Sequence, residues 1–216
     1  MPDPVEAARL CEDAGCGSIV CHLREDRRHI KDADVVMFRE TVRTRLNLEM
    51  SIAPEIVNFA CNISPDQATL VPEKRQEVTT EGGLDVKRNL KKVSAAVSRL
   101  KRSGIDVSLF INPSIGQIDA SVKAGAGIIE LHTGEYANAK SDAAARKELE
   151  ILKKAVKHAL SLGLEVNAGH GLNYENVRAV ACINGMNELN IGHSIISRAV
   201  FVGISAAVKE MLELVQ

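Results

Sequence analysis

Short runs of apolar and β-branched residues alternate along the chain with longer segments of helical periodicity. Seven runs have the composition of strands, at Ser18–Leu23, Arg45–Met50, Gln67–Glu73, Asp106–Asn112, Gly127–Thr133, Glu165–Gly171 and Glu188–His193. The runs do not alternate cleanly between apolar and polar residues, which is typical of parallel strands buried on both faces. The pattern therefore predicts a parallel sheet covered by helices.

The segments between these runs carry helix signals. Apolar residues recur at spacings of three and four from Val86 to Leu100, and Gly104 follows them. A similar pattern from Leu149 to Leu160 ends at Gly163. Further helices are predicted at Pro4–Ala14, at Glu55–Ala60 after Pro54, at a segment with Val177 and Val180 that Asn173 is placed to cap, and at Ile195–Val215.

Two architectures fit a strict alternation of strands and helices, an open doubly wound sheet and a (β/α)8 barrel. From His22 to Ile191 the repeat is about 28 residues long, close to the roughly 31 residues per unit of a typical barrel. No GxGxxG or P-loop motif follows the first predicted strand, which weakens the open-sheet interpretation. We therefore predict an α/β fold, a TIM (β/α)8 barrel forming a single domain over residues 1–216, with seven visible strands and the first barrel strand missing.

Composition and charge exclude several classes of function. The 216 residues are 45 % hydrophobic and 25 % charged, enough for one large core. The net charge of −1 gives no reason to expect a nucleic-acid or membrane partner, and 3 % aromatic content without Trp argues against base stacking. The first ten residues, MPDPVEAARL, lack the features of a signal peptide. We expect a cytoplasmic protein.

Ionisable side chains gather at the ends of the predicted strands, where barrel active sites lie. They are His22, Glu49, Glu73, Glu130, His132, His170 and His193. Glu49 and Glu130 are the most informative, because a carboxylate within an apolar run needs a partner or a raised pKa. An ion pair with a neighbouring strand is the structural alternative for each. The convergence of so many groups on one rim favours a catalytic site.

The loops on the same rim indicate phosphorylated substrates. Basic residues follow the first and third predicted strands, namely Arg24, Arg27, Arg28, His29, Lys74 and Arg75. Gly169–Gly171 and Ile191–His193 follow the last two strands, where barrels often bind phosphate through backbone N–H groups. The long polar loop Val71–Asp85 has the composition of a lid, with an ordinary surface loop as the alternative.

Seven segments together resemble one family, the pyridoxine 5′-phosphate synthases of vitamin B6 biosynthesis. The segments are VCHLREDRRHI, RLNLEM, LVPEKRQEVTTEGGLD, VSLFI, IELHTG, VNAGHGL and ELNIGH. The resemblance covers essentially the whole chain. It implies a (β/α)8 barrel, usually an octamer, that uses no metal or organic cofactor. It also implies condensation of 1-deoxy-D-xylulose 5-phosphate with 3-amino-2-oxopropyl phosphate to form the pyridine ring.

The resemblance also implies roles for individual residues. His22 and Glu49 match the general bases, His170 the proton donor, and Glu130 the residue that stabilises the transition state. The positions that match those holding the deoxyxylulose phosphate are Arg24, His29 and Thr79, and those matching the aminoketone phosphate site are Gly171, Gly192 and His193. The many proton transfers of imine formation and ring closure suit several His and Glu groups that titrate near neutrality.

The N-terminus is where the chain departs from the family. The resemblance implies an N-terminal strand and loop with an Asn-x-Asp-His motif and a further Arg, which contact both substrates. The chain opens at PDPV, downstream of these features, in agreement with the seven predicted strands. We therefore expect an incompletely closed barrel with unpaired edges.

Two other functions remain open on sequence alone. His and Glu side chains on successive strands could bind a divalent ion in a sugar-phosphate isomerase or hydrolase, although no HxH or HExxH spacing supports this. The expected gap in the barrel allows a second alternative, an inactive chain that binds phosphorylated ligands or only assembles with other copies.

Overall fold

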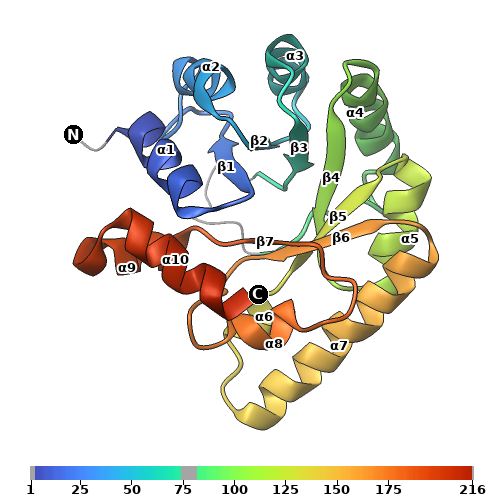
Figure 1. Ribbon diagram of the computed structural model, residues 1–216. Coiled ribbons are helices and arrows are strands. Elements are labelled where there is room, and N and C mark those ends of the chain that lie inside the picture. The colour runs from blue at the N-terminus through green and yellow to red at the C-terminus, as the bar shows by residue number, and fades with distance from the viewer. Residues whose placement is uncertain (1–2, 74–81, 216) are drawn as a thin grey trace.

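Seven parallel strands form one curved sheet in the computed structural model, which describes residues 3–73 and 82–215. The strands are β1 (Ser18–Leu23), β2 (Arg45–Met50), β3 (Gln67–Leu70), β4 (Asp106–Ile111), β5 (Ile128–His132), β6 (Glu165–Gly169) and β7 (Glu188–Asn190). Each strand pairs with the next one along the chain. The sheet curls into a nearly closed barrel (Figure 1), and within the described residues no pairing joins β7 to β1.

Helices surround the sheet and connect its strands (Figure 1). They are α1 (Pro4–Ala14), α2 (Asp32–Thr41), α3 (Pro54–Ile63), α4 (Leu90–Arg102), α5 (Ile115–Ala124), α6 (Gly134–Ala137), α7 (Asp142–Ser161), α8 (Val177–Ala181), α9 (His193–Val202) and α10 (Ile204–Val215). The first and last helices pack together, because α10 contacts α1 and the Ser205 hydroxyl donates to the Leu10 carbonyl at 3.4 Å. This contact joins the two ends of the helical layer.

The predicted barrel architecture and its seven strands are confirmed, with shorter strand ends. The third strand ends at Leu70 instead of Glu73, because Pro72 has no N–H group with which to continue the ladder. The seventh ends at Asn190, since His193 already belongs to α9. The first predicted helix, Pro4–Ala14, has the same bounds in the structure and ends at the left-handed Gly15.

The prediction of one continuous helix over Ile195–Val215 is wrong. The structure breaks this segment at Gly203, whose φ of 81° and ψ of 155° are incompatible with a helix. A residue with a side chain rarely adopts such a positive φ, so the glycine permits the break between α9 and α10.

Asn173 does not cap the helix that it was predicted to cap. The helix α8 begins at Val177, with Asn176 as its N-cap. The Asn173 side chain instead accepts hydrogen bonds from the N–H groups of Glu175 and Asn176, at 2.9 and 3.1 Å. It therefore stabilises the turn before the helix, a common use of asparagine.

The two faces of the sheet differ in polarity. Residues that alternate along the strands, such as Leu46, Leu48 and Met50 on β2, are fully buried and belong to the apolar core shared with the helices. The intervening positions of neighbouring strands carry buried polar groups, including Asn47, Thr69, Ser108, Glu130 and Asn167. The Thr69 hydroxyl donates to Asn47 Oδ1 at 2.9 Å, so these side chains meet on the inner face. Because side chains alternate along a strand, the same alternation brings Glu49 and Glu130 to the inner face.

The apolar layer outside the sheet should dominate the stability of the protein. We expect Leu109→Ala, at a fully buried position on β4, to lower the free energy of unfolding by about 2–5 kcal/mol through lost burial and a residual cavity. The measurement is urea unfolding followed by circular dichroism. Leu162→Ala is the matched control, since Leu162 is 41 % exposed, and should change stability by about 0.5 kcal/mol or less. Equal losses in both variants would contradict this description of the core.

Candidate active site

A cavity of about 400 Å³ opens at the carboxyl ends of the strands and the loops that follow them. Its lining consists of Glu49, Val71, Phe110, Glu130, His170, Gly171, Leu172, Asn173, Asn190, Ile191, Gly192, His193 and Ser194. The family resemblance assigns a role to ten residues, and six of these ten line the cavity. These come from segments that are far apart in the chain, and the shared orientation of parallel strands brings them to one rim.

Glu49 and His22 lie side by side near the cavity. They are register partners on β2 and β1, and His22 Nδ1 lies 3.8 Å from Glu49 Oε2. Burial raises the pKa of Glu49 to about 7. Burial, together with the charge of Arg24, lowers the pKa of His22 to about 4. At neutral pH, His22 is therefore an uncharged imidazole beside a carboxyl group poised to take up or release a proton.

Glu130 is a buried carboxyl in the wall of the same cavity. It lies on β5, is 2 % exposed, and accepts a hydrogen bond from Asn190 Nδ2 at 2.7 Å through Oε2. Burial raises its pKa well above the ordinary value, and the nearby charge of Glu49 acts in the same direction. Two carboxyl groups that disfavour each other's ionisation share one cavity, an arrangement typical of acid–base chemistry.

His170 follows β6 in a conformation that side chains rarely adopt. Its φ is 80°, and the Thr133 hydroxyl lies at hydrogen-bonding distance from the carbonyl oxygens of Gly169 and His170, at 2.7 and 2.6 Å. The His170 ring is 4.9 Å from that of His132, which in turn packs edge-on against Phe110 at 5.3 Å. Burial lowers the pKa of both histidines, that of His132 to about 4. The strained backbone thus holds an uncharged imidazole at the cavity wall.

The glycine segments supply backbone donors to the cavity. Gly171 has a φ of 79°, and an added Cβ there would lie 2.7 Å from Ala137 Cβ, so only glycine fits without a shift. Gly192 is the N-cap of α9, and His193 is the first residue of that helix. The N–H groups at a helix start are without partners inside the helix and favour an anion.

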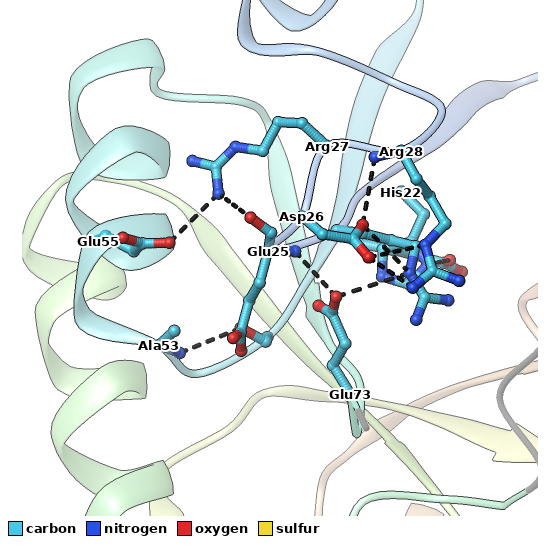
Figure 2. A network of polar contacts seen from close by, with 11 residues as sticks. His22, Glu25, Asp26, Arg27, Arg28, Ala53, Glu55 and Glu73 are labelled. Carbon is cyan, nitrogen blue, oxygen red and sulfur yellow. Dashed lines mark hydrogen bonds and ion pairs between the residues drawn. The ribbon is translucent and has the colours of Figure 1, made fainter. Parts of the chain in front are cut away.

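The basic loop after β1 does not present all its charge to the cavity. Figure 2 shows Arg27 directed toward Glu55 and Arg28 directed toward Asp26. The Arg27 guanidinium also lies 3.3 Å from Asp32 Oδ2. Neighbouring carboxylates therefore pair with both guanidinium groups in this structure, and a role of these arginines in binding a phosphorylated substrate stays a prediction.

Arg24, His29 and Glu73 lie outside the cavity lining. Arg24 is 8 % exposed, and its Nε is 3.6 Å from Glu73 Oε1. The same Glu73 oxygen accepts the N–H of Glu25 at 2.8 Å, so Glu73 ties the segments after β3 and β1 together. His29 is exposed. Thr79, Lys74 and Arg75, with most of the predicted lid, fall outside the described residues.

The sequence analysis assigned no site role to Phe110 and Asn190, which also line the cavity. Both occupy inward positions at strand ends, and Asn190 Nδ2 donates to Glu130 Oε2 at 2.7 Å. The alternation along the strands was the available signal.

No three His, Cys, Asp or Glu side chains within 3–73 and 82–215 are grouped in a way that could hold a metal ion. In the same residues, no helix combines the length and the apolar character needed to span a membrane.

The buried Glu49 carboxyl should destabilise the fold above the pH at which an unfolded glutamate ionises. Its pKa is about 7 in the folded state, so ionisation costs folding free energy at neutral and alkaline pH and nothing in acid. We expect Glu49→Gln to raise the free energy of unfolding by about 2 kcal/mol at pH 8 and by much less at pH 4.5. Urea unfolding at both values is the measurement. Glu40→Gln, at an exposed position on α2, is the control and should be neutral at both.

Solved structures of other proteins share this fold. The crystal structure of KGPDC from Streptococcus mutans has a TM-score of 0.71 and 11 % identity, covering 98 % of this chain and 90 % of that chain. The crystal structure of phosphoribosyl anthranilate isomerase from Thermus thermophilus has a TM-score of 0.63 and 16 % identity, covering 97 % and 92 %. At such identities the likeness concerns the fold alone.

Sequence comparison gives much closer relatives. A pyridoxine 5′-phosphate synthase from Geotalea uraniireducens is 55 % identical over 215 residues, covering 100 % of this chain and 90 % of the relative. One from Gloeothece citriformis is 58 % identical over 210 residues, covering 97 % and 88 %. The profile of the family described as pyridoxal phosphate biosynthesis protein PdxJ matches residues 1–216. The chain therefore belongs to the family of the pyridoxal phosphate biosynthesis protein PdxJ.

Proposed function

We propose that this chain is a pyridoxine 5′-phosphate synthase. It condenses 1-deoxy-D-xylulose 5-phosphate with 3-amino-2-oxopropyl phosphate, and it releases phosphate and water. The observation that carries the proposal is the pair of carboxyl groups with raised pKa, Glu49 and Glu130, facing one cavity with His170 and with His22 beside Glu49. The name shared by relatives at 55 % and 58 % identity supports the same reaction.

Glu49 and His22 act as the bases in this proposal. Imine formation, loss of phosphate and ring closure each require removal of protons from nitrogen or carbon. A carboxyl group with a pKa of about 7 is close to the optimum for a base that works at neutral pH. The neutral His22 imidazole, 3.8 Å from Glu49, can accept a proton or pass one to it.

His170 and Glu130 act at the stages where oxygen leaves. Departure of a hydroxyl as water requires a proton donor, and His170, which lines the cavity, has this role by family resemblance. Burial favours the neutral form of Glu130, and in that form the carboxyl can donate a hydrogen bond to charge that develops on the substrate. In this proposal the chain's own groups carry the proton transfers, as the family resemblance implies for an enzyme without a cofactor.

The two phosphate groups would occupy different parts of the rim. The backbone N–H groups near Gly171 and at the start of α9, from Gly192 and His193, suit the phosphate of the aminoketone. Arg24, His29 and Thr79 are proposed to hold the phosphate of deoxyxylulose on the basis of the family resemblance. Closure of the site around both substrates would exclude water during the elimination steps.

Assembly and location remain predictions. We propose a homo-oligomer, an octamer by family resemblance, of single-domain chains in the cytoplasm. The exposed apolar side chains Ile196, Val200 and Phe201 on α9 support an assembly, since contiguous exposed apolar surface is typical of protein contacts.

Removal of the acid–base groups should abolish synthesis while the fold is kept. We expect Glu49→Gln and His170→Asn each to lower kcat by about 10²–10⁴-fold, because each removes one proton-transfer group. The measurement is formation of pyridoxine 5′-phosphate from the two substrates. His158→Asn is the control, since His158 lies on α7 and pairs with Asp119 outside the cavity.

The same assay separates the alternatives. No turnover by the unmodified chain, with phosphorylated ligands still bound, would favour an inactive binding protein. Turnover that is lost on treatment with a chelator and restored by a divalent ion would favour a metal-dependent enzyme.

The rate should depend on the ionisation of Glu49. A general base acts as the carboxylate, so kcat/KM should be low in acid and rise with an apparent pKa near 7. The pH dependence of kcat/KM between pH 4 and 9 is the measurement. A limb near pH 4.5, as for a free glutamate, would show that Glu49 does not set the rate as the base.

A further inference from the structure

Each oxygen of the Glu130 carboxyl lies beside one neighbouring residue, Asn190 at Oε2 and Gly169 at Oε1. Asn190 Nδ2 donates a hydrogen bond of 2.7 Å to Oε2. Oε1 lies so close to Gly169 that a Cβ added at this glycine would be 2.3 Å from it. That space is available because residue 169 has no side chain.

The two residues beside the carboxyl belong to β6 and β7, the two strands that follow β5 in the sheet. Glu130 is on β5, Gly169 ends β6, and Asn190 ends β7, where it is the register partner of Gly169. The same Cβ added at Gly169 would also lie 3.0 Å from the carbonyl oxygen of Asn190. Backbone pairing therefore fixes both contacts relative to the carboxyl, with no flexible loop between them.

The hydrogen bond also distinguishes the two carboxyl oxygens. A neutral carboxyl group has one acceptor oxygen of the carbonyl type and one O–H group. Because Oε2 accepts from an amide N–H, we expect the neutral form of Glu130 to keep Oε2 as its carbonyl-type oxygen and to carry its proton on Oε1, beside Gly169. An oriented O–H group is a more effective donor than one that rotates among several positions.

We propose that Asn190 and Gly169 are positioning residues, which together hold the neutral Glu130 carboxyl in a single orientation with its proton on Oε1. The catalytic part of this inference rests on the proposed synthase function. The orientation itself concerns three residues of the chain and can be measured without substrate.

The test combines infrared spectroscopy with kinetics. The carbonyl band of protonated Glu130 is isolated at pH 7 by subtracting the spectrum of Glu130→Gln made in each background. We expect Asn190→Ala to shift this band to higher frequency, since the carbonyl loses its hydrogen bond. We also expect kcat to fall by about 10²-fold with a much smaller change in KM, as for a misplaced catalytic group.

Two further variants separate orientation from packing. Asn190→Leu keeps about the size of the side chain but removes the N–H donor without adding a group that can donate, and it should move the band and lower kcat as Asn190→Ala does. Gly169→Ala should displace Oε1 and lower kcat while the Asn190 side chain remains. Asn187→Ala is the matched control, because Asn187 Nδ2 donates to the Glu165 carboxylate at 3.0 Å at the other end of β7. It should leave both readouts unchanged.

The outcomes are distinct. A wild-type band frequency in both Asn190 variants, or kcat within about twofold of wild type in them, would overturn the inference. If the unmodified chain shows no turnover, the proposed function fails, and the infrared shift alone decides whether Asn190 orients Glu130. Asn190→Leu serves as the folded comparison if Asn190→Ala unfolds, as judged by circular dichroism.

Discussion

Parallel pairing of neighbouring strands is the constraint on which the rest of this structure depends. Each strand from β1 to β7 pairs in register with the next, so all of them end at one rim. Parallel strands require long return connections, and these connections are the helices that cover the sheet. Because side chains alternate along each strand, the register also decides which of them meet inside the barrel. His22 and Glu49 meet for this reason.

The register places the side chains that stabilise the fold and those of the cavity on opposite faces of the sheet. Outward side chains, such as Leu48 and Leu109, are fully buried in the layer between sheet and helices. The inner face carries Glu49 and Glu130, whose raised pKa values show that the fold disfavours their charged forms. The apolar layer offsets this cost, so that groups unfavourable for folding persist where proton transfer needs them.

Much of the fold and part of the site could be predicted from the chain. All seven strands start where predicted or within one residue of it, since β-branched runs and helical spacing are local signals. Six of the ten predicted site residues line the cavity, because the ends of parallel strands, and the polar groups they carry, meet at one rim of the barrel. The pairing of Arg27 with Glu55 could not be predicted in this way, because these residues are far apart in sequence and both belong to polar surface segments.

The sequence by itself determined the order of elements, the polarity of each strand position and the family to which the chain is similar. These properties follow from local composition and spacing, which do not depend on which residues are neighbours in space. The tertiary structure alone decided that Asn190 donates to Glu130, that the space beside Gly169 holds a carboxyl oxygen, and that Gly203 divides the last helical segment. Each depends on distances between segments or on a backbone angle, and those are set only when the strands pair and the helices pack.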